Sequence, residues 1–92
     1  IQPDLAIAHY NLGLLYKAQG QFGAAIAAYQ QALQLQPDYA DAYQNLGVVY
    51  LKLGQIQNSL TAFQRAIALH QLDHPAEALR LQQALTEMGL PI

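Results

Sequence analysis

Apolar residues recur along this chain with helical spacing, and no stretch alternates with the period of two that marks a β-strand. A first apolar stripe runs over Ala8, Leu12, Leu15 and Tyr16. A second runs over Phe22, Ala25, Ile26, Tyr29 and Leu33. The pattern predicts two helices in the first third of the chain.

The residues between and around these stripes predict where the helices end. Pro3-Asp4 supplies a stop followed by an N-cap acceptor, and Gly20 can close the first helix in the left-handed conformation without a Cβ penalty. The second helix should stop at Gln36, because a residue before proline is pushed out of the helical region. The short link at Gly20-Gln21 predicts an antiparallel pair.

The same pattern then repeats. When residues 3–36 are laid over 37–70 without a gap, 14 of 34 positions are identical. The identical pairs are Pro3/Pro37, Asp4/Asp38, Ala6/Ala40, Ala8/Ala42, Asn11/Asn45, Leu12/Leu46, Gly13/Gly47, Tyr16/Tyr50, Gly20/Gly54, Gln21/Gln55, Ala28/Ala62, Gln30/Gln64, Ala32/Ala66 and Leu35/Leu69. Such a period indicates stacked helical repeats, so a second pair is expected at about 39–52 and 56–69.

Close packing within each pair is expected at the repeated glycines. Gly13 and Gly47 lack a Cβ, which lets the second helix approach closely, with Ala25 and Ser59 predicted opposite them. Tyr16, Tyr29, Tyr50 and Phe63 are large enough to fill the space between successive helices. We interpret these residues as core.

The tail predicts a fifth helix over about 74–89. Asp73 or His74 can cap it, Pro75 suits the first turn, and Glu77 complements the helix N-terminus. Its expected apolar side is Ala78, Leu81, Leu85 and Met88. With one inserted residue, Leu46, Tyr50 and Gly54 align with Leu81, Leu85 and Gly89. We interpret this helix as a cover for the last hydrophobic face, as stacked repeats require.

These elements predict one all-α domain over residues 1–92: a repeat at about 3–36, a second at about 37–70, and a terminal helix at about 74–89. Ile1-Gln2-Pro3-Asp4 matches Leu35-Gln36-Pro37-Asp38, where one repeat runs into the next. The chain is therefore expected to be a fragment of a longer protein.

Composition excludes several function classes. Hydrophobic residues make up 53% and charged residues 11%, which excludes intrinsic disorder. Four Lys and Arg residues are too few for a phosphate-binding patch, so nucleic acid is not an expected partner. No apolar run is long enough to span a membrane, and no cysteine is present for a disulfide or a thiolate site. These residues leave the compartment open, with the cytoplasm as the expectation.

The repeat resembles the tetratricopeptide repeat (TPR) over nearly the whole chain. The matching residues are His9, Leu12, Gly13, Tyr16, Ala25, Tyr29, Ala32 and Pro37, then Tyr43, Leu46, Gly47, Tyr50, Ser59, Phe63 and Ala66. The sequence departs from the family at His9 and Tyr43, where Trp is frequent, at Ser59 in place of Ala, and at Gln71 in place of a closing Pro. The resemblance implies helix pairs stacked into a right-handed superhelix.

For function, the resemblance implies a protein-interaction scaffold whose concave surface is lined by the first helix of each pair. On this chain that surface would carry Ile7, Tyr10, Asn11, Leu14, Lys17 and Ala18, then Tyr39, Asp41, Gln44, Asn45, Val48, Leu51 and Lys52. An asparagine amide both donates and accepts, so Asn11 and Asn45 could hold a peptide backbone. Alternatively, the two amides satisfy backbone groups at the helix contact.

Two subtypes of the family can be compared with these residues. The runs Tyr10-Asn11-Leu12-Gly13 and Gln44-Asn45-Leu46-Gly47 are similar to repeats of O-linked N-acetylglucosamine transferases, which carry asparagine ladders. Chaperone-tail-binding members grip a terminal carboxylate with Lys, Asn and Arg. Here those places hold Tyr10, Leu14, Gln44 and Val48, and only Lys17 and Lys52 are basic. The groove therefore suits a neutral or apolar peptide, or a helix, better than an acidic tail.

No catalytic or cofactor site is predicted. His70, Asp73 and His74 lie within five residues, but their spacing fits neither a structural zinc site nor a His-Glu-x-x-His motif. We interpret His70 as a partner of a helix C-terminus and Asp73 or His74 as a cap. Three function classes stay open: a peptide-binding scaffold, a self-association element acting through repeat stacking, and a non-catalytic arm of a larger enzyme such as a glycosyltransferase.

Overall fold

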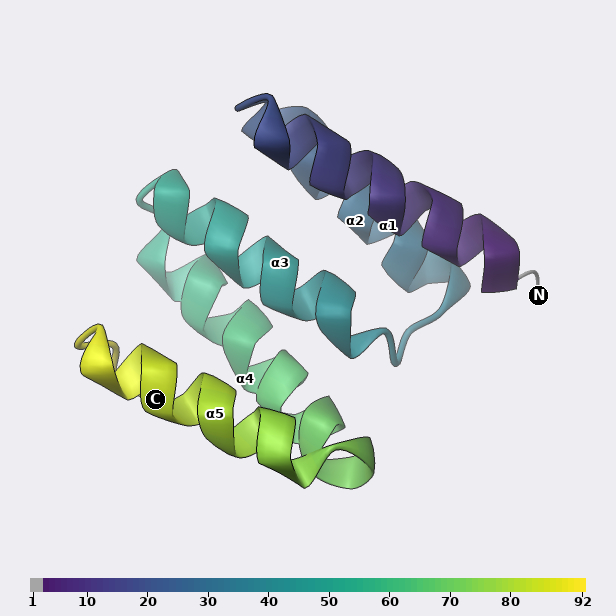
Figure 1. Cartoon of the computed structure of the whole chain (residues 1–92). Coiled ribbons are helices and arrows are strands. Elements are labelled where there is room, and N and C mark those ends of the chain that lie inside the picture. The colour runs from purple at the N-terminus through teal and green to yellow at the C-terminus, as the bar shows by residue number, and fades with distance from the viewer. Residues whose placement is uncertain (1–2) are drawn as a thin grey trace.

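The computed structural model describes residues 3–92, which form five helices and no strand. The helices are α1 (Pro3–Ala18), α2 (Phe22–Leu35), α3 (Ala40–Lys52), α4 (Ile56–Asp73) and α5 (Pro75–Glu87). They follow one another in a row of antiparallel neighbours, with α1 at one end and α5 at the other (Figure 1). The all-α repeat fold predicted from the periodicity is confirmed.

Three helices end in the same way because a glycine follows each of them. Gly20, Gly54 and Gly89 have φ of 75°, 75° and 86°, in the left-handed region that favours glycine. After α1, the Gly20 N–H donates to Lys17 O at 3.0 Å and the Gln21 N–H to Tyr16 O at 2.9 Å. This pair of bonds is the Schellman arrangement, and it satisfies carbonyl groups that the helix end would otherwise leave unpaired.

The proline positions set the remaining helix ends. α2 ends at Leu35, two residues before Pro37, whereas α4 continues to Asp73 rather than stopping near residue 69. The reason is that Gln71 stands where the first repeat has Pro37, so nothing stops α4 before Pro75. His74 is the N-cap of α5 but makes no side-chain capping bond. Ile1-Gln2 and the side chains of Pro3 and Asp4 lie outside the described part of the chain.

Packing within each pair centres on an aromatic ring that lies over a glycine. A Cβ added to Gly47 would lie 2.7 Å from Cδ1 and Cε1 of Phe63, and a Cβ added to Gly13 would collide with the ring of Tyr29. The atoms nearest to such a Cβ on Gly13 thus belong to Tyr29, and Ala25 is fully buried in the same cluster as Tyr29. Ser59 does face Gly47, since its buried Oγ donates to the Gly47 carbonyl at 2.8 Å.

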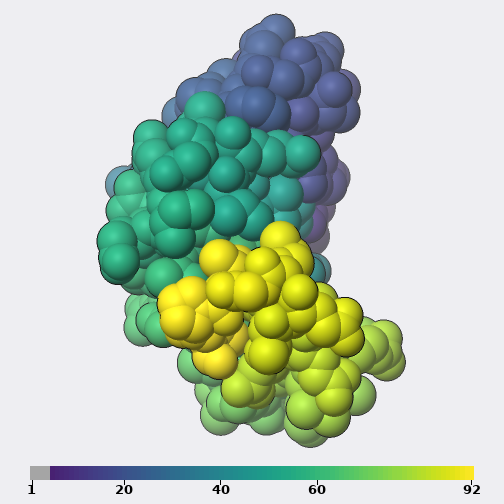
Figure 2. All heavy atoms as spheres, turned by 90° about the vertical axis from the view of Figure 1, so that its left-hand side faces the viewer, coloured from purple at the N-terminus to yellow at the C-terminus, as the bar shows by residue number. Residues whose placement is uncertain are grey.

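Two buried clusters join the helices. The first contains Tyr29 of α2 with Leu46 and Val49 of α3, and it links the two repeats. The second joins Phe63 and Ile67 of α4 to Ala78 and Leu85 of α5, together with Leu81 at its edge. Figure 2 shows the yellow C-terminal segment lying against the green and teal second repeat. Met88, expected on the apolar side of this helix, is instead exposed because it follows the last turn of α5.

Candidate functional site

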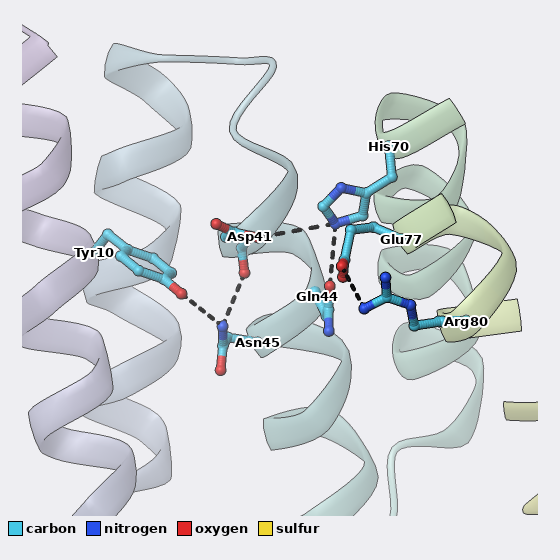
Figure 3. Close-up of polar contacts among 7 residues, drawn as sticks. All are labelled: Tyr10, Asp41, Gln44, Asn45, His70, Glu77 and Arg80. Atoms are coloured by element: carbon cyan, nitrogen blue, oxygen red, sulfur yellow. Dashed lines mark hydrogen bonds and ion pairs between the residues drawn. The ribbon is translucent and has the colours of Figure 1, made fainter. Parts of the chain in front are cut away.

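A polar contact joins α1 to α3 on the surface predicted to be concave. Lys17 Nζ of α1 donates to Asn45 Oδ1 of α3 at 2.6 Å. Asn45 Nδ2 in turn donates to the hydroxyl of Tyr10 at 2.9 Å and to the carbonyl of Asp41 at 3.0 Å. Figure 3 shows Tyr10 and Asn45 pointing toward each other from their two helices.

These bonds use both hydrogens and one acceptor position of the Asn45 amide. Asn45 therefore links the two repeats through the side chains of Lys17 and Tyr10, and its one bond to a backbone group is to Asp41 O of its own helix. Asn11 occupies the same position one repeat earlier but is exposed, and within residues 3–92 its side chain makes no hydrogen bond. The two asparagines thus occupy equivalent positions of the repeats but differ in their side-chain hydrogen bonds.

Tyr10 lies in an aromatic group at the centre of this surface. Its ring centroid is 4.9 Å from that of Tyr39 and 5.8 Å from that of Tyr29. Burial raises the pKa of Tyr10 to about 12, with further contributions from the nearby Asp41 carboxylate and Tyr39. The Tyr10 hydroxyl is therefore protonated at neutral pH. Because its oxygen accepts the hydrogen bond from Asn45, the hydroxyl hydrogen is still available for donation to another group.

A second polar contact joins α3 to the end of α4. His70 Nε2 lies 3.1 Å from Gln44 Oε1 and 3.8 Å from Asp41 Oδ1 (Figure 3). His70 is buried, and its Nδ1 has no hydrogen-bond partner within the described part of the chain. Gln44, predicted as a groove residue, is thus held in place by His70.

A shallow cavity of about 180 Å³ opens beside this contact, between the α2–α3 and α4–α5 linkers. Its polar lining consists of Gln36, Asp38, Tyr39, Asp41, His70, Asp73 and His74. The three carboxylates make this end of the surface acidic. Among the side chains that the structure describes, those of residues 5–92, no three His, Asp or Glu groups are arranged to hold a metal ion.

The other residues predicted for the concave surface differ in exposure. Ile7, Asn11, Ala18, Asp41 and Lys52 are exposed, whereas Leu14, Tyr39, Gln44, Val48 and Leu51 are half-buried. Val48 packs against the cluster between α4 and α5. The structure thus brings Tyr10, Lys17, Tyr39, Asp41 and Asn45 together and leaves Ile7 and Asn11 available beside them.

Sequence reasoning missed two further features. The Arg65 guanidinium lies 5.6 Å from the ring centroid of Tyr43, beside a pocket of about 210 Å³ between α3 and α4. The contact of Gln44 with His70 was also not foreseen, because the spacing of 26 residues follows no repeat period. The repeat alignment could have suggested neither contact, since Gln31 and Gln36 stand at the equivalent positions of Arg65 and His70 in the first repeat.

Comparisons with known proteins agree with this geometry. A family model described as TPR repeat matches residues 15–54, and one described as tetratricopeptide repeat matches residues 40–73. The chain is built from tetratricopeptide repeats. A crystal structure of a tetratricopeptide repeat domain protein from Salinibacter ruber superposes with a TM-score of 0.78 at 23% identity, covering 92% of this chain and 97% of that one. Among curated proteins, none matches the sequence.

TPR repeats generally mediate protein–protein interactions and are generally non-catalytic. The signature residues of this TPR chain have a structural role: Gly13 and Gly47 admit the rings of Tyr29 and Phe63. No helix in the described part of the chain is long and apolar enough to cross a membrane.

Proposed function

We propose that this TPR chain is a non-catalytic module that binds a protein segment, either an extended peptide or a helix, on the surface formed by α1 and α3. The observation that carries the proposal is the ordered group of Tyr10, Lys17 and Asn45, fixed by hydrogen bonds of 2.6 and 2.9 Å beside the exposed Ile7 and Asn11. A surface that is ordered before binding loses little side-chain entropy when a partner arrives.

The chemistry of this surface favours a neutral or apolar segment. Lys17 already interacts with Asn45, so it is less available to a terminal carboxylate. Asp41 is exposed, and Asp38 and Asp73 line the neighbouring cavity, so an acidic tail would meet like charge. Asn11 can supply both a donor and an acceptor to a peptide backbone, and the Tyr10 hydroxyl can supply one donor.

The test begins with a random peptide library displayed on phage and selected on the full chain. The selected peptide is then titrated into isotope-labelled protein, and amide shifts are followed by NMR. We expect the largest shifts on α1 and α3, and we expect Asn11→Ala to weaken binding by about 2- to 10-fold, the loss of one hydrogen bond. The circular dichroism spectrum and melting temperature should not change.

Gln30→Ala and Gln64→Ala are the matched controls, because both exposed amides lie on the second helices. They should leave binding unchanged. If the controls weaken binding and Asn11→Ala does not, the partner lies on the outer face and the proposed surface is wrong. Selection of acidic peptides would likewise contradict the charge argument.

A second candidate is a non-catalytic arm of a larger enzyme such as a glycosyltransferase. It rests on the Asn-Leu-Gly runs shared with repeats of the O-linked N-acetylglucosamine transferase type. In those repeats the asparagines form a ladder, whereas here the Asn45 amide is occupied within the chain. The sequence of the gene that encodes this chain would test this candidate directly.

A further inference from the structure

The cavity between the α2–α3 and α4–α5 linkers, called the acidic cavity below, is lined by Asp38, Asp41, Asp73 and His70 among others. All of its lining residues fall within 36–74, and a helix stands on each side of both linkers. Tyr39 and Asp41 belong both to this cavity and to the α1–α3 surface. A protein segment bound on that surface can therefore extend a side chain into the acidic cavity.

The carboxylates of the acidic cavity have no permanent counter-charge among the described side chains. None of the four Lys and Arg residues of the chain lines the cavity. The one ion pair there joins Asp41 Oδ1 to His70 Nε2 at 3.8 Å, and the imidazole is charged only when protonated. Because three carboxylates around one cavity repel one another, a cation from outside the chain is favoured there.

Helix capping does not account for these aspartates. Asp38 precedes Tyr39, the N-cap of α3, and Asp73 precedes His74, the N-cap of α5. Neither helix end has a side-chain capping bond. Asp73 is also the last residue of α4, where the helix dipole disfavours a negative charge. The carboxylate oxygens are thus available to accept hydrogen bonds from a ligand.

His70 provides a second, independent observation. Its side chain lines the acidic cavity and is only 7% exposed. Nε2 faces two oxygens, Gln44 Oε1 at 3.1 Å and Asp41 Oδ1 at 3.8 Å, so in the neutral ring Nε2 carries the hydrogen. Nδ1 is then a buried acceptor with no donor, on the side of the ring turned away from Gln44 (Figure 3). Buried acceptors are normally satisfied, so this nitrogen points to a donor supplied by a ligand.

We propose that the acidic cavity binds a basic side chain, arginine or lysine, of the protein segment held on the α1–α3 surface. The guanidinium and ammonium groups carry positive charge and only donate hydrogen bonds, which matches three carboxylates and the Nδ1 acceptor of His70. The inference rests on the proposed function and narrows its partner. The segment is neutral or apolar along α1 and α3 and carries one basic residue at the end beside α4.

Small probes test the cavity without any selected peptide. The isotope-labelled full chain is titrated with N-acetyl-arginine amide, N-acetyl-lysine amide and, as a neutral control of similar shape, N-acetyl-citrulline amide. The two basic probes should shift the amides of residues 38–41 and 70–74 and the Nδ1 resonance of His70, with affinity in the millimolar range. Citrulline should shift neither. Equal shifts with citrulline, or no shifts with the basic probes, would overturn the proposal.

Charge-removing variants test whether the aspartates hold the probe. Asp38→Asn and Asp73→Asn keep the size of the side chain and should each weaken the binding of N-acetyl-arginine amide by about 2- to 5-fold. Glu87→Gln is the matched control, since it removes one exposed carboxylate at the far end of α5. It should leave binding unchanged. If all three variants weaken binding equally, the attraction comes from net charge and the cavity is not the site.

A last measurement separates this proposal from the proposed function. The peptide selected on the full chain is lengthened by one arginine, at its amino end in one version and at its carboxyl end in another. Only the version that brings arginine to the acidic cavity should bind more tightly, and Asp73→Asn should remove the gain. If neither arginine helps, the cavity proposal fails and the α1–α3 surface stands. If the small basic probes bind and no peptide does, the proposed function fails and the cavity assignment stands.

Discussion

Asn45 of α3 donates its side-chain amide to the hydroxyl of Tyr10 on α1 across 2.9 Å, although the two residues are 35 positions apart in the sequence. Lys17 donates to the oxygen of the same amide. The surface proposed to bind a partner is thereby ordered by the contact that also joins the two repeats. Stability and binding should therefore respond differently to changes at Asn45 and at its counterpart Asn11.

Asn45→Ala should destabilise the fold, because it removes three hydrogen bonds and leaves the half-buried Lys17 and Tyr10 without their partner. A cost of roughly 1–2 kcal/mol in the free energy of unfolding is expected. Asn11→Ala should stay within about 0.5 kcal/mol of the natural chain, since its side chain is exposed. Urea unfolding of both variants measures the difference; equal effects would show that the Asn45 contacts contribute nothing specific.

Gly47→Ala should also destabilise the protein. The added Cβ would lie 2.7 Å from two carbons of the Phe63 ring, which is buried and cannot move freely. Overpacking of this kind costs about 1–3 kcal/mol, and Gly47→Leu should cost more. Gly23→Ala is the control, because a Cβ there meets nothing within 4 Å. Thermal melts should separate the two alanine variants, and a Gly47→Ala protein as stable as the control would disprove the close contact.

Tyr29→Phe should leave the fold as stable or make it more stable. The Tyr29 hydroxyl is buried and has no hydrogen-bond partner among residues 3–92, and the matching residue of the second repeat is already Phe63. An unpaired buried hydroxyl costs about 1–3 kcal/mol, which the substitution removes. The reverse change, Phe63→Tyr, should destabilise by a similar amount. Urea unfolding of this pair gives the comparison, and a marked loss of stability in Tyr29→Phe would reveal a partner for the hydroxyl.

Stability should fall in alkaline solution. Burial raises the pKa of Tyr10 and of Tyr29 to about 12, above the ordinary value of 10.0. The folded state thus disfavours tyrosinate, so the stability from these groups is complete below about pH 10 and is lost as the pH rises toward about 12. Melting temperatures across this range should decline less steeply for Tyr10→Phe than for the natural chain. Parallel curves would show that Tyr10 ionises as freely in the folded chain as in the unfolded one.

Local chemistry made the helices and their ends predictable. Gly20 and Gly54 end α1 and α3 because glycine takes a positive φ without strain, and this property does not depend on the rest of the fold. The end of α2 before Pro37 follows from the same kind of local rule. α4 was expected to end near residue 69, but it extends to Asp73. A local rule explains this as well, because position 71 holds Gln and not a proline that would end the helix.

The candidate site was only partly predictable. The resemblance to the tetratricopeptide repeat predicted a shared surface for Tyr10, Asn11, Lys17 and Asn45, and the structure brings Tyr10, Lys17 and Asn45 into contact. The resemblance could not say that the Asn45 amide is used within the chain while the Asn11 amide is not. Nor could the repeat predict the contact between Gln44 of α3 and His70 in the last turn of α4, where His70 Nε2 lies 3.1 Å from Gln44 Oε1. Such contacts depend on how helices pack, which no local pattern encodes.

Leu12 and Leu46 show most clearly which properties follow from the sequence and which follow from the tertiary structure. The sequence by itself determined that both are apolar positions of a first helix, and by that rule they are equivalent. The tertiary structure leaves Leu12 39% exposed and Leu46 5% exposed. The physical reason is that burial depends on a neighbouring helix: α2 lies against α3, and within the described chain no helix lies against the same side of α1.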